Sequence, residues 1–421
     1  MTRPSSDTSP GAAPDTVQRC RLCHGNALEP MMDLGSLPIA HRLLSSADED
    51  EEVFPMSLSV CRDCGLTQID NPIDPEVLYR SYNYNFSSWK AEPHLESELD
   101  SIFAYGPFRS AFEIGCNEGL FLDELRNRGI DACVGVEPNP VSGELARERG
   151  FQVFGSMISP EVCTAAIEIN GRFDLVVSRQ VIEHVLDLDS FFACIDMLLD
   201  EDGLLFLDMP DFGPSLQVAD CSVLWEEHVS YFSEPVIKRL LDQKGFETME
   251  LHRYNFGGGS MAVLARRRSG PTAGRASESG DDGALDLARS LGARSDRYRQ
   301  RLTEALSGAR GQGAQVVLYG VGLRGCMVAN GLSLGEYIDF AIDDQPEKHG
   351  KYMPGARLEI RPVLSLNDGE GPVVVLLAVA NENEEKVAAA LKDRLTRPLT
   401  IVSLCGPRDF WQDLDNLKAL Q

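Results

Sequence analysis

The chain has 421 residues, too many for a single hydrophobic core, so we expect two or three domains. The formal net charge of −26 argues against a nucleic-acid partner, which requires a basic surface. The hydrophobic content of 43% is typical of globular proteins, no apolar run is long enough to span a membrane, and the polar first residues contain no signal-peptide core, so we expect a cytoplasmic protein.

Residues 1–17 are rich in Ser, Pro, Thr and Asp and are predicted to be a disordered tail. Two Cys-x-x-Cys pairs follow, Cys20 with Cys23 and Cys61 with Cys64. Four thiolates in two such turns are the ligand set of one tetrahedral zinc ion. Eleven cysteines without an export signal favour metal ligands or reduced thiols over disulfides, so two unrelated reduced pairs are the alternative. We predict a zinc-binding domain over residues 18–71.

The next segment, residues 72–103, is polar and aromatic and contains Tyr82, Tyr84 and Ser87. Two structures suit this composition equally well. One is an ordinary linker that ends in a helix, and the other is a lid over a ligand bound at the following strand.

The stretch from Ala111 to Gly119 has the pattern of a strand, a glycine turn and a helix. Gly115 and Gly119 allow a ligand to approach the backbone; Glu113 precedes them and Asn117 lies between them. About twenty residues later a second apolar run ends in Glu137, where an acid can accept both hydroxyls of a ribose. The alternative is an ordinary βαβ turn without a ligand. The pattern E-x-G-C-N-x-G, followed by this acid, resembles the S-adenosylmethionine-binding motifs of class I methyltransferases.

Strand and helix patterns alternate from residue 110 to about 265 and predict a doubly wound α/β domain over residues 72–268. Ligands of such sheets bind at the carboxyl ends of the strands. The predicted strands are Ala111–Ile114, Ala132–Val136, Val153–Phe154, Asp174–Ser178, Gly203–Asp208 and Met261–Arg266. The predicted helices are 119–128, 140–149, 159–168, 187–200 and 233–244.

Residues 269–310 are predicted to be a Gly- and Ser-rich linker followed by a long polar helix, at about 284–306. Residues 311–421 then repeat the strand, glycine turn and helix pattern, beginning at Gln315. We expect a second, Rossmann-like α/β domain, although the spacing of its glycines is a weak signal by itself.

Three features in this order resemble the sugar-nucleotide C-methyltransferases. They are the two cysteine pairs, the core motif Ile114–Gly119, and the stretches Tyr319–Gly325 and Ile342–Gly355. The resemblance implies a zinc-binding N-terminal domain, a class I S-adenosylmethionine-dependent methyltransferase domain, and a Rossmann-like C-terminal domain that helps to hold the substrate. It implies that the substrate is a nucleotide-linked sugar. The acidic charge and the lack of a long apolar run predict that neither nucleic acid nor a membrane is a partner. The oligomeric state is left open.

By the same resemblance, Tyr82, Tyr84 and Ser87 would cover the cofactor, and His184 and the pair Glu227–His228 would face the substrate. The complete set of expected cofactor-binding residues is Tyr82, Tyr84, Ser87, Glu113, Gly115, Asn117, Gly119, Glu137, Pro138, Ser178 and Gln180. The chain also departs from the family pattern near the expected substrate. Trp225 stands in place of the usual Tyr, Gly257 in place of a His, Arg324 in place of a Lys, and His41 in place of an Asn.

Methylation of carbon requires the removal of a proton next to a ketone and stabilisation of the resulting enolate. His228 is the favoured base because imidazole titrates near neutral pH, and Glu227 could orient it. His184 could donate a hydrogen bond to the developing oxygen, and Tyr231 is a second candidate base. Each of these could instead be a packed residue. A methyltransferase acting on oxygen or nitrogen, and a binding protein without activity, are the alternatives.

Overall fold

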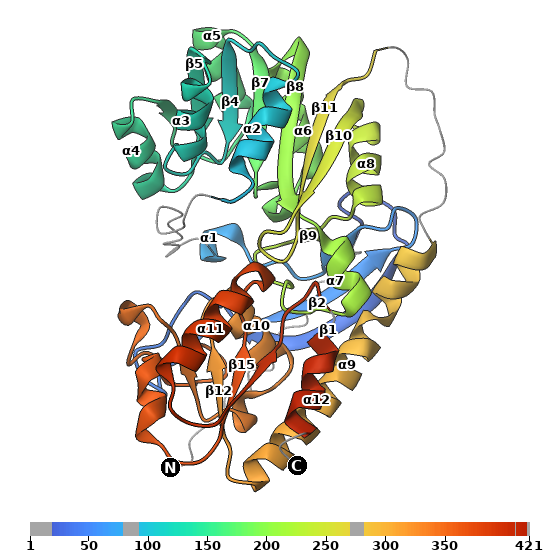
Figure 1. The fold of residues 1–421 in the computed structure, drawn as a ribbon. Coiled ribbons are helices and arrows are strands. Elements are labelled where there is room, and N and C mark those ends of the chain that lie inside the picture. The colour runs from blue at the N-terminus through green and yellow to red at the C-terminus, as the bar shows by residue number, and fades with distance from the viewer. Residues whose placement is uncertain (1–18, 79–91, 270–281, 409, 419–421) are drawn as a thin grey trace, which may run out of the picture.

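The computed structural model describes residues 19–78, 92–269, 282–408 and 410–418. Within these ranges the chain forms three β-sheets, which Figure 1 shows with the helices that cover them. The predicted tail, and the predicted cofactor-covering residues Tyr82, Tyr84 and Ser87, lie outside the described residues.

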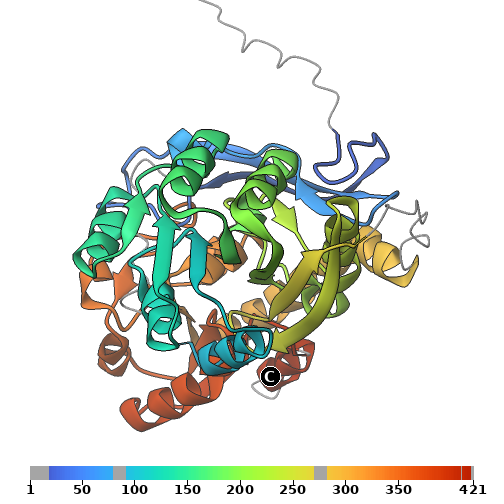
Figure 2. The ribbon, with the colours of Figure 1, turned by 90° about the horizontal axis from the view of Figure 1, so that it is seen from above.

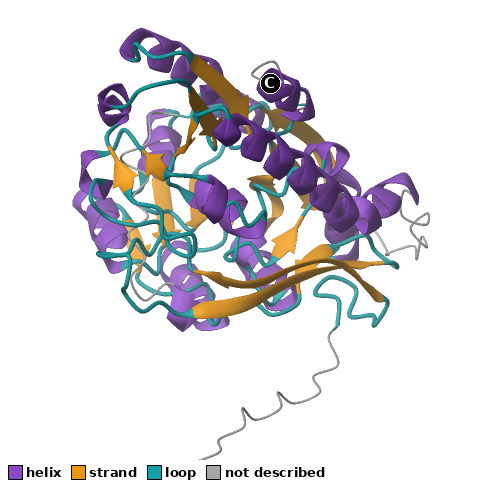
Figure 3. Ribbon diagram, turned by 90° about the horizontal axis from the view of Figure 1, so that it is seen from below, coloured by secondary structure: helices purple, strands orange, loops and turns teal. Residues whose placement is uncertain are grey.

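The N-terminal sheet is antiparallel and has the strand order β1-β2-β3-β9. Three strands come from the first seventy residues and the fourth from the middle of the chain: β1 (Leu28–Pro38), β2 (Val53–Cys61), β3 (Thr67–Ile69) and β9 (Ser230–Tyr231). Figure 2 shows the two long strands along one side of the molecule, and Figure 3 shows them from below with the helices on one side of them. Because β9 pairs with β3, this sheet is not built from the N-terminal segment alone.

The central sheet has the order β10-β11-β8-β7-β4-β5-β6. Five strands are parallel, and β11 and β10 continue the sheet in antiparallel pairings. The strands are β4 (Ser110–Ile114), β5 (Ala132–Val136), β6 (Gln152–Phe154), β7 (Phe173–Arg179), β8 (Leu199–Pro210), β10 (Phe246–Tyr254) and β11 (Ser260–Arg267). The accompanying helices are α1 (Pro75–Leu78), α2 (Leu95–Phe103), α3 (Leu120–Asn127), α4 (Pro140–Glu148), α5 (Pro160–Asn170), η2 (Ile182–His184), α6 (Leu188–Leu198), α7 (Phe212–Val218) and α8 (Glu234–Gln243).

Side-chain caps explain where several of these helices begin. Asn139 accepts a hydrogen bond from the backbone N–H of Val141 at 2.9 Å, directly before Pro140 opens α4. Asp187 caps α6 in the same way, by accepting the N–H of Ser190 at 3.0 Å. Such caps satisfy backbone donors that have no partner within the helix, so the segments after β5 and β7 turn into helix at defined residues.

The C-terminal sheet is parallel, with the order β14-β13-β12-β15-β16. Its strands are β12 (Gln315–Tyr319), β13 (Phe340–Ile342), β14 (Ile360–Arg361), β15 (Val373–Leu377) and β16 (Leu399–Ser403). Its helices are α9 (Asp282–Gly311), α10 (Leu323–Gly331), η3 (Gly335–Tyr337), η4 (Pro346–Lys348), η5 (Val363–Asp368), η6 (Asn381–Asn383), α11 (Glu384–Arg394), η7 (Phe410–Gln412) and α12 (Asp413–Lys418). None of the helices in the described part of the chain combines the length and hydropathy of a membrane span.

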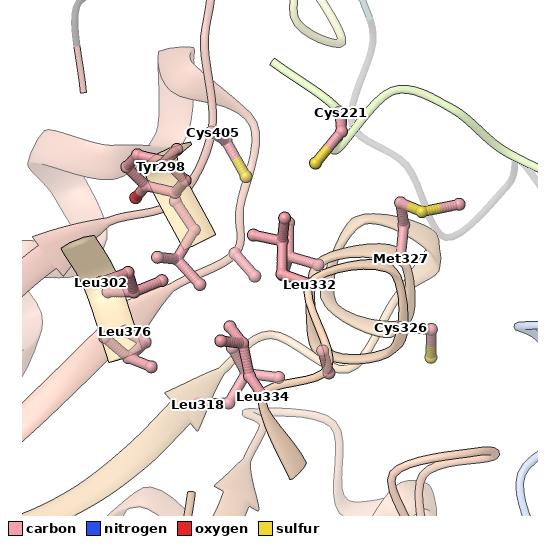
Figure 4. Packing of buried hydrophobic residues seen from close by; sticks show 14 of the residues in the cluster. Cys221, Tyr298, Leu302, Leu318, Cys326, Met327, Leu332, Leu334, Leu376 and Cys405 are labelled. Carbon is pink, nitrogen blue, oxygen red and sulfur yellow. The ribbon is translucent and has the colours of Figure 1, made fainter. Parts of the chain in front are cut away.

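Helix α9 joins the C-terminal sheet to the N-terminal one. Its residues Tyr298 and Leu302 belong to a buried cluster that also contains Leu332, Leu334 and Cys221, as Figure 4 shows. Cys221 comes from the loop after α7, so this apolar core is shared by the N-terminal sheet, the segment from α7 to β9, and the C-terminal domain with α9. Apolar burial of this kind is the main term that holds domains against each other.

The α/β fold class is confirmed, and each strand predicted in the central domain corresponds to an observed one. Two strands between residues 110 and 268 were not predicted, and neither were the short helices η2 and α7. Strand β10 alternates half-buried and exposed residues at the edge of the sheet and carries Glu247, Glu250 and Arg253, which hides its apolar pattern. Strand β9 has only two residues. The predicted domain boundaries stay a prediction.

We predict that Gly292→Ala destabilises the protein through the contact of α9 with β1. A Cβ atom at Gly292 would lie 2.7 Å from the carbonyl oxygen of Met31. Overpacking typically costs about 1–3 kcal/mol, which exceeds the gain of about 0.5–1 kcal/mol from replacing a helical glycine by alanine. The midpoint of urea denaturation should therefore fall.

Gly311→Ala is the matched control, because a Cβ there meets no atom within 4 Å at the end of the same helix. An equal rise in the midpoint for both variants would contradict the close approach of α9 and β1.

Candidate functional site

The four N-terminal cysteines come together at the base of the first sheet. The Sγ atoms of Cys20 and Cys64 are 3.3 Å apart, those of Cys23 and Cys61 are 3.5 Å apart, and all four lie within 4.8 Å of one another. A tetrahedral zinc–thiolate site holds its sulfur atoms about 3.8 Å apart. The adjacent His24 turns away, and its Nε2 contacts Asp189 at 2.8 Å. The sulfur set therefore fits one zinc ion without a histidine ligand.

Packing the thiols so closely opposes their joint ionisation. Contact with Cys61 raises the pKa of the Cys20 thiol, and contacts with Cys20 and Cys61 raise that of Cys64. A divalent cation removes this obstacle, because zinc binds thiolates and its binding free energy adds to the free energy of folding.

The glycine turn after β4 lies at the carboxyl end of the central sheet. Gly115 and Gly119 both have φ of 77°, in the left-handed region that favours glycine. A Cβ at Gly115 would lie 2.6 Å from Val181, and one at Gly119 would lie 3.0 Å from Phe151. Side chains at either position would therefore displace the neighbouring segments and narrow the space above the sheet.

Glu137 follows β5 and fastens the turn from the side. Its Oε2 accepts the N–H of Asn117 at 3.0 Å, and its Oε1 accepts the N–H of Asn139 at 2.7 Å. Burial raises the pKa of the carboxyl, whereas these two N–H groups lower it. Each carboxylate oxygen has two acceptor positions, so both oxygens can still accept hydroxyl groups of a ribose.

Glu113 lies on the other side of the turn and is 3% exposed. Its Oε2 has no hydrogen-bond partner among the described residues, and burial raises the pKa of the carboxyl to about 8. Nearby, Arg179 at the end of β7 forms ion pairs with Glu92 and Glu98. The sequence did not single out Arg179, whose only signal was its place after an apolar strand. The Oε2 atom of Glu113 is therefore available to form a hydrogen bond with a ligand at the glycine turn.

A single cavity of about 1450 Å³ begins at this turn and extends to the C-terminal domain. The following residues, which the sequence analysis placed in the site, line this cavity: Glu113, Gly115, Asn117, Glu137, Pro138, Gln180, His184, Glu227, His228 and Tyr231. Gly119 and Ser178 were also predicted to bind the cofactor but are not among the residues that line the cavity, and Ser178 is buried. Gln180 donates from Nε2 to Asp208 at 2.9 Å. Leu323 closes the far end from the first turn of α10.

The predicted catalytic residues meet where η2 packs against β9 and the segment that precedes it. The Nδ1–H of His184 donates to the carbonyl oxygen of Glu227 at 2.9 Å, which leaves a lone pair on Nε2 of the neutral ring. The rings of His184 and His228 are 4.9 Å apart, and Trp225 lies 4.6 Å from His228. The Tyr231 hydroxyl donates to the carbonyl of Trp225 at 3.1 Å.

Burial sets the protonation of these groups. It lowers the pKa of His184 to about 4 and that of His228 well below its usual range, with repulsion from His184 and Arg324 adding to the effect. Burial also raises the pKa of Tyr231 well above its usual range. At neutral pH His228 is therefore a neutral imidazole that can accept a proton. Tyr231 is a phenol committed to a backbone carbonyl.

Three positions that depart from the family pattern are in contact. The guanidinium of Arg324 lies over the Trp225 ring, with its Cζ 5.6 Å from the centroid, and Nη2 donates to the carbonyl of Gly257. A Cβ at Gly258 would lie 2.3 Å from Arg324, whereas a Cβ at Gly257 would meet no atom within 4 Å. These three positions therefore form one connected part of the cavity wall.

Models of known protein families match the chain in three consecutive segments. The "zinc binding domain" matches residues 20–79, the "Methyltransferase domain" residues 95–251, and the "C-methyltransferase C-terminal domain" residues 256–395. Together these matches show a methyltransferase with a zinc-binding domain and a C-methyltransferase C-terminal domain. The resemblance stated from the sequence is confirmed, and so is the expectation of an enzyme that uses S-adenosylmethionine and has a zinc-binding domain.

Individual relatives differ in how much of this methyltransferase they match. The C-methyltransferase NovU of Streptomyces niveus is 27% identical over 359 residues, which are 82% of this chain and 85% of that protein. The mitochondrial ubiquinone biosynthesis O-methyltransferase of Homo sapiens is 31% identical over 100 residues, 23% of this chain and 27% of its own. Among solved structures, a 1,6-didemethyltoxoflavin N1-methyltransferase of Burkholderia thailandensis aligns with a TM-score of 0.36 and 16% identity, covering 51% of this chain and 96% of its own.

We predict that Cys61→Ser removes the zinc and, with it, much of the activity. Cys61 ends β2, which pairs with β3, and β3 pairs with β9 just after His228. Loss of the metal should therefore loosen β3 and β9. Elemental analysis should find one zinc per wild-type chain and little in the variant. Wild-type protein grown with zinc and never chelated that holds less than half an equivalent would refute the assignment.

We predict that Glu137→Ala weakens S-adenosylmethionine binding, because the carboxylate accepts hydrogen bonds at the position of the ribose. Loss of hydrogen bonds to a charged group costs about 1.5–3 kcal/mol, or roughly ten- to a hundredfold in affinity. Calorimetry measures this directly. Glu144→Ala, at an exposed carboxylate of the next helix, is the control that should bind like wild type.

Proposed function

We propose that this methyltransferase methylates a carbon atom of a nucleotide-linked 4-keto-deoxysugar, next to the ketone. The observation that carries the proposal is the neutral, buried His228 in the same cavity as the glycine turn. A base beside the methyl-donor site is needed for carbon, because carbon must first lose a proton. The family of the chain, and the C-methyltransferase NovU among its relatives, support methylation at carbon.

The residues divide the work as follows. S-adenosylmethionine supplies an electrophilic methyl group. Glu113, Glu137 and the turn at Gly115 bind the cofactor, and His228 removes the proton from the sugar carbon. The Glu227 carbonyl fixes the orientation of His184 through the hydrogen bond at 2.9 Å. Trp225 packs against His228 and excludes water from one face of its ring.

The C-terminal domain is proposed to hold the nucleotide. The turn between β12 and α10 presents Leu323 to the cavity. Asp343, at the end of β13, accepts the N–H of Val321 at 2.9 Å and contacts Lys348 at 3.0 Å, which fixes this turn. The turn therefore faces the acceptor side of the cavity in a defined conformation.

We predict that His228→Asn lowers turnover by about 10²–10⁴-fold, the usual contribution of a general base, while cofactor affinity stays near that of wild type. Incorporation of solvent deuterium into the sugar carbon, measured by mass spectrometry on a panel of keto-sugar nucleotides without cofactor, should fall in parallel. Tyr231→Phe should lose far less, because its hydroxyl serves a backbone carbonyl.

Two outcomes would count against this function. Retention of turnover and exchange by His228→Asn would place the base elsewhere. Absence of exchange by wild type with every keto sugar, together with methylation of an oxygen or nitrogen acceptor, would replace carbon by a heteroatom.

A further inference from the structure

Glu183 is a buried acid in the wall of the cavity that the sequence did not single out. It lies in η2 between β7 and α6, directly before His184, and is 2% exposed. Neither of its carboxyl oxygens has a hydrogen-bond partner among the described residues, although the residue lines the cavity. The only sign of its role in the sequence is its position directly before a candidate catalytic histidine, His184.

The surroundings of Glu183 offer no charge that would balance an ionised carboxylate. No arginine or lysine in the described ranges forms an ion pair with it, and His184 Nε2 lies 4.0 Å from Oε1. The imidazoles of His184 and His228 are held neutral by burial, and Asp208 and Glu227 repel a negative charge at this point.

An unpaired buried carboxylate costs several kcal/mol, and such groups stay protonated instead. Burial accordingly raises the pKa of Glu183 well above its usual range. The result is a buried O–H donor, in a residue that lines the cavity, without an acceptor among the described residues. Proteins use neutral carboxylic acids of this kind to donate a hydrogen bond to an enolate oxygen.

His184 is the less suitable donor. Its Nδ1–H is committed to the carbonyl of Glu227, so Nε2 of the neutral ring carries a lone pair and accepts. Donation from Nε2 would need a protonated ring, which burial opposes.

We propose that Glu183 is a further catalytic residue that donates its O–H to the ketone oxygen of the acceptor as the enolate forms. This inference rests on the proposed function. The proton passes from the sugar carbon to His228, and the electron pair of the C–H bond moves into the enolate, whose charge accumulates on oxygen. Glu183 keeps its proton and shares it with that oxygen in a hydrogen bond.

The test compares Glu183→Leu, which cannot donate, with Glu183→Gln, whose amide can. Loss of one such donor typically lowers turnover by about 10²–10³-fold, so the leucine variant should lose turnover and deuterium exchange on that scale. The glutamine variant should recover part of both. Glu226→Gln is the matched control. This buried glutamate of the segment before β9 accepts the N–H of Ala40, which an amide oxygen can also do.

The pH dependence separates catalysis from packing. Activity that requires protonated Glu183 falls as the pH rises through its pKa, so wild type should show an alkaline decline that Glu183→Gln lacks. Infrared difference spectra at neutral pH should show a carboxylic acid band in wild type that is weaker in that variant, where the contribution of Glu113 remains. S-adenosylhomocysteine binding, measured by calorimetry, should stay unchanged and reports an intact fold.

Three results would overturn the proposal. The first is full exchange by Glu183→Leu, and the second is an alkaline decline that persists in Glu183→Gln. The third is a second metal ion per wild-type chain that both variants lose, because Glu183, His184 and His228 place three ligand atoms within 4.8 Å of one another. Failure of the proposed function is distinguishable, since wild type itself would then show no exchange.

Discussion

The pairing of β9 with β3 is the interaction on which the proposed catalytic site depends. Ser230 and Tyr231 continue the N-terminal sheet opposite Gln68 and Thr67. The N–H of Ile69 donates to the carbonyl of Val229 at 3.1 Å, and Arg21, inside the first cysteine turn, donates to the same carbonyl at 2.9 Å. Because the strand is only two residues long, it has little stability of its own. The two cysteine turns therefore help to fix the position of His228 in the cavity wall.

Burial then determines the chemistry of that segment. The same apolar surroundings that stabilise the shared core keep two imidazoles neutral and one carboxyl protonated. Water reaching this region would lower the cost of ionisation and exchange these proton states. Packing among the three sheets therefore also determines which of these side chains carry a proton.

Sequence patterns predicted the central sheet and the cofactor turn, because apolar periodicity and glycine spacing are local signals. Gly115 and Glu137 could be placed in this way. Glu183 could not, since its significance is the absence of a partner, which only tertiary structure reveals. Strand β9 escaped detection for a similar reason: its two residues form a strand only because β3 lies beside them. The contact of Arg324 with Trp225, a hundred residues apart in the chain, is likewise a property of the fold.

The C-terminal domain hydrogen-bonds both backbone polar groups of one residue, Gly257, in the loop between β10 and β11. Glu382 accepts the N–H of Gly257 at 2.9 Å, and Arg324 donates to its carbonyl. Gly257 has no side chain, so this part of the cavity wall is formed by its backbone. The position of that backbone is determined by the contacts with Glu382 and Arg324 of the C-terminal domain. Under the proposed function, substitutions at 324 and 382 should therefore change the acceptor side of the cavity and leave the glycine turn of the central sheet unchanged.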